Sequence, residues 1–130
     1  MKTTKNVLIV NDGVSDLVQI SRRIAAELSG MHVVVMEGAD LSATDLLPAD
    51  LYFFGCSEAN PRGFSELQRV LKGINLAGRA CALFTIASKE AIGYLQDLVR
   101  DAELQVYPDP FLASKKRSEK EWVETILQRS

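Results

Sequence analysis

Two hydrophobic patterns alternate along the chain. One is a short, continuous apolar run, typical of a strand that is buried on both faces of a parallel sheet. The other is an apolar stripe at steps of three and four residues, typical of a helix that covers such a sheet. Five runs predict strands: 7–10, 32–36, 51–54, 81–84 and 104–107. Helical stripes lie at 17–28, 64–74, 91–99 and 122–127, and 41–48 is a shorter crossover that could be helical.

Local signals place the ends of some elements. Ser15 is a plausible N-cap for the first helix, and Gly30 is a plausible C-terminal stop. Pro108 and Pro110 punctuate the end of the last strand. The alternation of strands and helices implies right-handed crossovers and an α/β fold, with one parallel sheet between two layers of helices. We therefore expect a single domain over residues 1–130, with five strands in the order 2-1-3-4-5.

The loops that follow the strands are where a ligand is expected. In open α/β sheets, ligands bind beyond the carboxyl ends of the strands, at the point where the winding reverses. Here that edge is formed by the loops at 11–15, 55–63 and 85–89. These three loops are the candidate site.

Composition excludes several classes of function. Hydrophobic residues make up 47% of the chain and charged residues 25%, as in globular proteins, and the formal net charge is −2. Such a chain lacks the positive surplus that nucleic-acid binding needs, so nucleic acid is not an expected partner. His32 is the only histidine, which disfavours a Ser-His-Asp triad or a multi-histidine metal site. We assign no catalytic residue and no metal ligand.

The compartment is predicted from the cysteines and the N-terminal region. Cys56 and Cys81 form no Cys-x-x-Cys pair and lie in apolar segments, which favours buried free thiols in a reducing compartment. The first apolar run spans only residues 7–10, whereas a signal peptide needs about 7–15 apolar residues and a membrane span about 20. We expect a cytoplasmic protein with no membrane partner.

Two segments carry a resemblance to a known family. Residues 49–55 read Ala-Asp-Leu-Tyr-Phe-Phe-Gly and resemble the Asp-led third strand of flavodoxins, which ends in Gly before the flavin loop. Residues 76–84, with a Leu-x-Gly-basic turn before an apolar run, are similar to the family's entry into the fourth strand. The resemblance covers nearly the whole chain. It implies a flavodoxin-like three-layer sandwich, FMN as cofactor, electron transport as function and a redox protein as partner.

The first loop departs from the family's phosphate-binding pattern. Flavodoxins hold the FMN phosphate in a (Ser/Thr)-x-Thr-Gly-x-Thr loop at a helix N-terminus. In the aligned residues 10–15, Gly13 and Ser15 fit this pattern, but Val10 and Asp12 replace hydroxyl residues. The resemblance thus implies a weakened phosphate site, because the Asp12 carboxylate would repel the phosphate. The alternative is a plain strand-to-helix turn in which Asp12 or Ser15 caps the helix.

The other two loops lack the aromatic residues that flank the flavin ring in the family. No aromatic residue precedes Phe64 in the second loop, and the position of Phe64 on an apolar stripe favours core packing. Tyr94 is the aromatic residue nearest to the third loop, and a half-buried place on a helix is the favoured interpretation. The resemblance assigns these candidate cofactor-binding residues: Asn11, Asp12, Gly13, Val14, Ser15, Cys56, Ser57, Glu58, Ala59, Asn60, Ala87 and Ser88.

A second family shares this winding. Residues 7–12 and 107–111 resemble the first strand and the last-strand corner of phosphoacceptor receiver domains. Phosphorylation there needs an Asp at the end of the third strand, where this chain has Gly55 and Cys56. The remaining alternative is a cofactor-free interaction or regulatory module without phosphorylation. In either case an electron carrier or a binding module is favoured over a catalyst.

Overall fold

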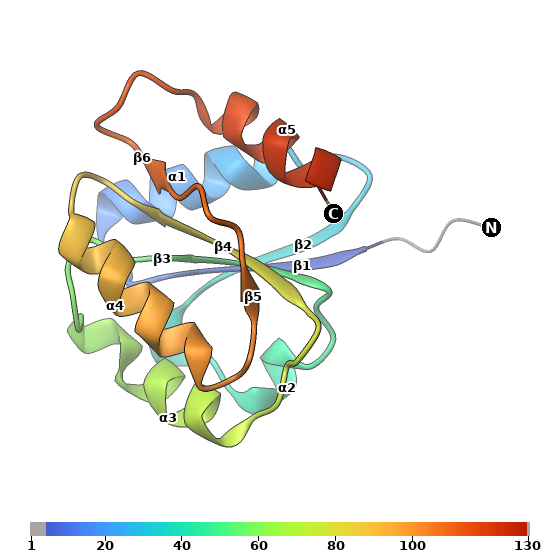
Figure 1. The fold of residues 1–130 in the computed structure, drawn as a ribbon, viewed down its shortest axis with the longest axis vertical. Coiled ribbons are helices and arrows are strands. Elements are labelled where there is room, and N and C mark those ends of the chain that lie inside the picture. The colour runs from blue at the N-terminus through green and yellow to red at the C-terminus, as the bar shows by residue number, and fades with distance from the viewer. Residues whose placement is uncertain (1–4, 130) are drawn as a thin grey trace.

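A parallel sheet forms the middle layer of the molecule (Figure 1). The computed structural model describes residues 5–129. The strand order is β2-β1-β3-β4-β5, and β6 also pairs with β4, all in parallel. The predicted winding is therefore confirmed, with a sixth strand added. The strands are β1 (Asn6–Asn11), β2 (His32–Glu37), β3 (Leu51–Gly55), β4 (Ala80–Thr85), β5 (Gln105–Val106) and β6 (Phe111–Leu112).

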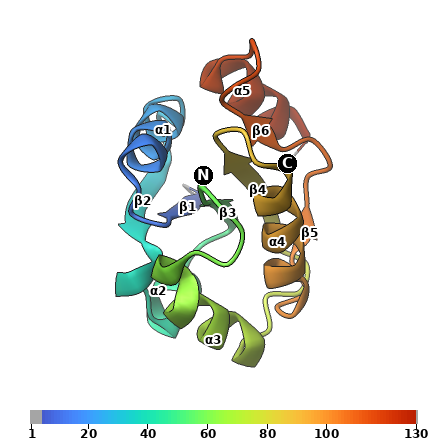
Figure 2. The same cartoon turned by 90° about the vertical axis from the view of Figure 1, so that its left-hand side faces the viewer.

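Helices cover both faces of the sheet (Figures 1 and 2). The α-helices are α1 (Ser15–Ala26), α2 (Ala43–Leu46), α3 (Ser65–Gly73), α4 (Lys89–Arg100) and α5 (Glu119–Arg129). Short 3-10 turns η1 (Gly38–Asp40) and η2 (Arg62–Phe64) precede α2 and α3. Helices α1 and α5 bury one apolar cluster against the sheet, and α2, α3 and α4 bury another on the opposite face. None of the helices within residues 5–129 is both long and apolar enough to span a membrane.

The fifth strand position is divided into two short pieces. Gln105 is in register with Ala80 at the start of β4, whereas Phe111 is in register with Phe84 near its end. The prolines at 108 and 110 lie between the pieces, and proline cannot donate to a strand ladder. The single predicted strand at 104–107 is thus shorter than expected, and pairing with β4 resumes beyond the prolines.

The ends of α1 differ from the prediction. Val14 is the N-cap residue, with no side-chain cap, and Ser15 is the first helical residue. The helix ends at Ala26, before Gly30. Gly30 has a φ of 83° and lies in the turn that leads into β2. Ser15 lies one residue inside the helix, so its hydroxyl cannot take the N-cap geometry. The prediction of both ends was wrong.

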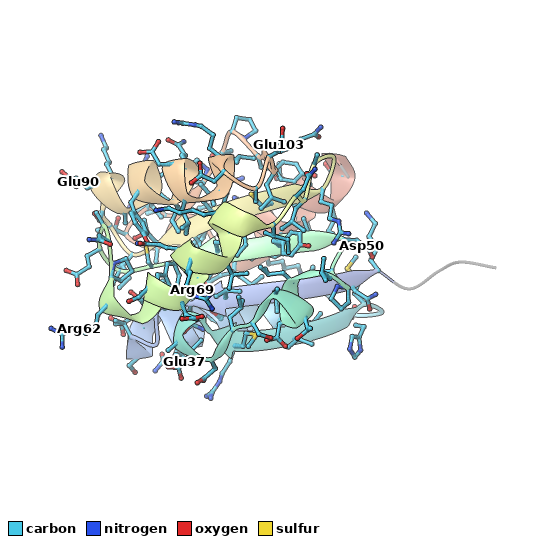
Figure 3. All side chains as sticks on the ribbon, turned by 90° about the horizontal axis from the view of Figure 1, so that it is seen from below. Glu37, Asp50, Arg62, Arg69, Glu90 and Glu103 are labelled. Atoms are coloured by element: carbon cyan, nitrogen blue, oxygen red, sulfur yellow. The ribbon has the colours of Figure 1, made fainter. Side chains whose placement is uncertain are left out.

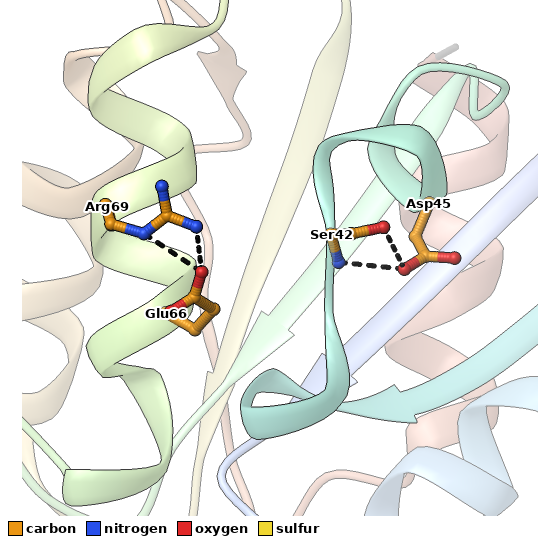
Figure 4. A network of polar contacts seen from close by, with 4 residues as sticks. All are labelled: Ser42, Asp45, Glu66 and Arg69. Carbon is orange, nitrogen blue, oxygen red and sulfur yellow. Dashed lines mark hydrogen bonds and ion pairs between the residues drawn. The ribbon is translucent and has the colours of Figure 1, made fainter.

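Separate local polar contacts lie at the start of α2 and on the surface of α3 (Figure 4). The Ser42 backbone N–H donates to the Asp45 carboxylate at 2.8 Å, and the Ser42 hydroxyl donates to the same oxygen at 3.1 Å. These bonds start the helix at the next residue. On the surface of α3, the Arg69 guanidinium donates to the Glu66 carboxylate. Such exposed pairs contribute little to stability.

Arg79 forms several hydrogen bonds at the end of the sheet where the strands begin. Arg79 Nη1 donates to the carbonyl oxygens of Leu47 and Ala49 at 2.7 and 3.0 Å. It also donates to the Tyr52 hydroxyl at 2.9 Å, and that hydroxyl donates to Leu46 at 2.6 Å. Burial raises the pKa of Tyr52. The network ties the end of α2 to the start of β4.

Candidate functional site

The β1–α1 loop is shaped by a buried asparagine at the end of β1. Asn11 Nδ2 donates to the Ser21 hydroxyl at 3.1 Å, and its Oδ1 accepts from the Gly13 N–H at 2.9 Å. Gly13 has a φ of 84°, a left-handed conformation that favours glycine. Asn11 is 1% exposed, so it orders the loop from inside and does not offer its own side chain to a ligand.

Asp12 joins this loop to the loop that follows β3. One carboxylate oxygen accepts from the Ser57 N–H at 2.8 Å and from the Ser57 hydroxyl at 2.7 Å. The other accepts from the Val14 N–H at 3.1 Å. Neither Asp12 nor Ser15 caps α1, so that part of the plain-turn alternative was wrong. The carboxylate is directed at the neighbouring loop.

Gly63 brings the far end of the β3–α3 loop against the same residue. A Cβ atom added at Gly63 would lie 2.7 Å from the Asp12 carbonyl oxygen. This approach leaves no room for a side chain, so glycine is required. Sequence reasoning did not single out Gly63. Both ends of the β3–α3 loop therefore contact Asp12.

The first turn of α1 has unused hydrogen-bond donors. Its Ser15, Asp16 and Leu17 N–H groups have no acceptor within residues 5–129, since no side chain caps the helix. By contrast, α4 is capped, because the Ser88 hydroxyl accepts from the Ala91 N–H at 3.0 Å. Free N–H groups and the helix dipole together make such an end favourable for an anion.

Cys56 follows β3 and is buried. Its N–H donates to Phe84 O at 3.3 Å, and its carbonyl accepts from the Thr85 hydroxyl at 2.7 Å. Burial, and next the Asp12 carboxylate, raises the pKa of the Cys56 thiol to about 12. Burial also raises the pKa of Cys81 to about 12. Both residues are free cysteines, as predicted, and neither thiol is activated as a nucleophile.

The rest of the second loop is linked to α3 and α4. Asn60 has a φ of 53°, and its Oδ1 accepts from Gln68 Nε2 at 2.9 Å. The same Gln68 nitrogen donates to the Tyr94 hydroxyl. Tyr94 is half-buried on α4, as expected, and burial raises its pKa. The loop residues Glu58 and Ala59 are exposed.

The β4–α4 loop is bonded to the chain that follows β6. Ala113 N–H donates to Thr85 O at 3.1 Å, and Ser114 N–H donates to Ile86 O at 2.8 Å. Ala87 is exposed between these bonds and the Ser88 cap. In Figure 3, Arg62 and Glu90 mark the end of the molecule that carries the candidate loops, and Asp50 lies towards the other end.

None of the aromatic side chains within residues 5–129 is fully exposed. The chain has five Phe, three Tyr and one Trp, all within the described residues. Phe64 is fully buried, which confirms its predicted place in the core. The half-buried rings are Tyr94 and Tyr107, and the Tyr107 hydroxyl donates to Ile126 O at 3.0 Å. The buried rings are Tyr52, Phe53, Phe54, Phe64, Phe84, Phe111 and Trp122.

Comparisons with known proteins identify the fold. No family model and no curated protein matches the chain. Flavodoxin 2 from Bacillus cereus superimposes with a TM-score of 0.80 at 18% identity, over 96% of this chain and 99% of that one. A Streptococcus pneumoniae flavodoxin superimposes with a TM-score of 0.78 at 15% identity, over 98% of this chain and 100% of that one. A Fusobacterium nucleatum flavodoxin variant with bound flavin mononucleotide superimposes with a TM-score of 0.69 at 12% identity, over 87% of this chain and 79% of that one. The chain therefore has a flavodoxin-like fold.

Proposed function

We propose that residues 1–130 form a single flavodoxin-like domain that binds FMN weakly and carries electrons to a redox partner protein in the cytoplasm. The observation that carries this proposal is the uncapped N-terminus of α1, whose Ser15, Asp16 and Leu17 N–H groups are free. A similar fold with bound flavin mononucleotide supports it. The proposed contacts come from Asp12, Gly13, Val14, Ser15, Ser57, Glu58, Ala59, Asn60, Ala87 and Ser88, while the buried residues Asn11 and Cys56 would support these loops from the core side.

The phosphate end of the site fits the cofactor better than the ring end. Three N–H groups and the exposed Ser15 hydroxyl supply donors for a phosphate. The Asp12 carboxylate opposes that charge, although its bonds to Ser57 direct it towards the second loop. At the ring end, the exposed loop residues are small or polar, and no exposed aromatic ring lies within residues 5–129.

These features set the expected affinity. An aromatic stacking contact contributes roughly 0.5–1.5 kcal/mol in addition to the free energy of burying its apolar surface. This site lacks an exposed aromatic ring for such a contact. A like charge close to the phosphate costs about 1 kcal/mol in water and more at lower dielectric. FMN should therefore bind less tightly than in a site with hydroxyl and aromatic ligands. When bound, the flavin supplies the redox chemistry, and the chain positions it.

A cofactor-free interaction module is the second candidate. The observation that favours it is the burial of the aromatic side chains, together with the Asp12–Ser57 contact that joins two of the three loops. A fold by itself does not fix a function. In that case the three loops would be a surface for another protein and would hold no flavin.

A paired titration separates the two candidates. FMN and riboflavin, which lacks the phosphate, are each titrated with the protein while flavin fluorescence is followed. If the protein is an FMN carrier, micromolar protein should quench FMN fluorescence and should have a clearly weaker effect on riboflavin fluorescence. If neither flavin is quenched at millimolar protein, the cofactor-free module replaces the carrier. Nanomolar FMN binding would show that Asp12 does not weaken the site.

A further inference from the structure

One edge of the sheet, formed by β2, has unused backbone hydrogen-bonding groups. The His32 N–H donates to the carbonyl oxygen of Lys5, the residue before β1, at 2.9 Å, so the backbone groups of His32 face β1. Backbone groups alternate in direction along a strand. Those of Val33, Val35 and Glu37 therefore point away from β1. Within residues 5–129 no strand pairs with them, because β2 is the last strand on its side of the sheet (Figure 2).

Both faces of this edge strand carry exposed apolar side chains. Val34 is 43% exposed and Val35 is 37% exposed. Neighbouring residues on a strand point to opposite faces, so the two valines lie on different sides of the sheet. A helix docked on one face could cover only one of them. A partner that extends the sheet, with its own flanking helices, would cover both.

The two edges of the sheet differ in their protection against such pairing. At the opposite edge, β5 and β6 have two residues each and are separated by Pro108 and Pro110. Short strands and prolines are devices that prevent edge-to-edge association. The edge strand β2 has six residues in continuous register with β1 and contains no proline, lysine or arginine. Within residues 5–129, this is the sheet edge that is open for an added strand.

We propose that β2 pairs with β2 of a second copy of this chain, antiparallel and centred on Val35. This register uses all three outward residues, because Val35 faces the partner's Val35 and Val33 faces the partner's Glu37. On the other face, Val34 meets the partner's Met36. The Val35–Val35 and Val34–Met36 pairs next to the two-fold axis are thus apolar, and the same strand contributes both sides of the contact, as in an isologous interface.

Charge favours the antiparallel arrangement of identical strands. The start of β2 lies next to Lys5, whose carbonyl oxygen accepts from the His32 N–H, and its end has Glu37, with Asp40 three residues further on. An antiparallel pair places the acidic end of each strand beside the basic end of the other. A parallel pair would bring Glu37 next to its own copy. The central residues 33–36 are uncharged, so no like charges meet at the axis.

The mass of the protein in solution tests the dimer. Light scattering after size exclusion should give twice 14.3 kDa at high concentration. Val35→Lys places two like charges at the axis and should give a monomer with an unchanged circular dichroism spectrum. The matched control is Leu47→Lys, at an exposed leucine that follows α2, which should remain dimeric. A monomeric native chain, or a dimer that survives Val35→Lys, would overturn the proposal.

Cysteine cross-linking tests the register without relying on stability. Cβ atoms of directly opposed residues lie about 5 Å apart, close to the reach of a disulfide. Val35→Cys should therefore give a covalent dimer on mild oxidation. Val33→Cys should not, since two copies of that residue would lie about 13 Å apart along the strands. The native Cys56 and Cys81 are buried and should not contribute. Equal cross-linking of both variants would contradict the register.

Discussion

Asp12 and Ser57 are 45 residues apart in the chain, and two hydrogen bonds of 2.8 and 2.7 Å join them at the carboxyl edge of the sheet. In the sequence resemblance to flavodoxins, Asp12 aligns with a hydroxyl residue of the phosphate loop. Its carboxylate is held by the loop after β3, with a third bond from the Val14 N–H. The residue that we propose weakens phosphate binding therefore also positions two of the three candidate loops.

Removing the Ser57 hydroxyl should destabilise the protein. Ser57→Ala deletes the donor to Asp12 but keeps the backbone N–H bond, so a loss of about 1 kcal/mol in unfolding free energy is expected. Urea unfolding measures it. Ser29→Ala is the control, because Ser29 is exposed, and its effect should stay within about 0.5 kcal/mol. Equal stabilities of the two variants would show that the hydrogen bond from the Ser57 hydroxyl to Asp12 contributes nothing to stability.

Neutralising Asp12 should strengthen FMN binding. Asp12→Asn keeps the size of the side chain and removes the charge, and a repulsion of about 1.4 kcal/mol corresponds to tenfold in affinity. Riboflavin affinity should not change, because riboflavin has no phosphate. Glu58→Gln, at an exposed carboxylate in the second loop, is the matched control and should have a smaller effect on FMN. An equal gain for both flavins would exclude charge repulsion as the cause.

Arg79 should contribute more to stability than an exposed cation. Arg79→Met removes three hydrogen bonds, to Leu47, Ala49 and Tyr52, and we expect a loss of about 2 kcal/mol. Lys72→Met, at an exposed position on α3, should be nearly neutral. Thermal unfolding followed by circular dichroism compares the two. Similar midpoints would mean that solvent replaces the Arg79 contacts at no cost.

Alkaline pH should lower stability through the buried thiols. The folded-state pKa of Cys56 and of Cys81 is raised to about 12, from an ordinary value of 9.0. Below pH 9 the two thiols are protonated in both the folded and the unfolded chain, and their contribution to the unfolding free energy is fully present. It is lost as pH rises from 9 towards 12, because the unfolded chain releases protons that the folded chain keeps.

The slope of this pH dependence can be assigned to one thiol. In reducing buffer, the unfolding free energy of Cys81→Ser should fall less steeply with pH than that of the native chain. The difference in slope should be up to about 1.4 kcal/mol per pH unit. Its absolute stability is irrelevant, since only the slope is compared. An unchanged slope between pH 9 and 11 would show that the Cys81 thiol ionises equally in both states.

The strand order followed from local patterns, whereas several boundaries did not. Continuous apolar runs such as residues 7–10 indicate buried parallel strands, and the alternation with helices restricts their winding. The N-cap of α1 was misplaced by one residue because Ser15 looks like a cap in sequence. The division of the last strand depends on pairing beyond Pro110, which a local pattern does not reveal.

The candidate loops were also placed correctly at the level of topology, but their contacts were not predictable. That Asp12 accepts from Ser57 depends on two loops brought together by the β1–β3 pairing. The need for Gly63 arises from close approach to Asp12, and no local turn pattern signals it. Long-range contacts of this kind become visible only in the folded chain.

Backbone amide chemical shifts test the central claim most directly, that the FMN phosphate binds at the uncapped N-terminus of α1. In proton–nitrogen correlation spectra of the labelled protein, FMN should shift the amides of Ser15, Asp16 and Leu17. Inorganic phosphate should shift the same three amides at higher concentration, and riboflavin should leave them in place. If FMN binds while these amides stay unmoved, or if none of the three ligands moves them, the account is contradicted.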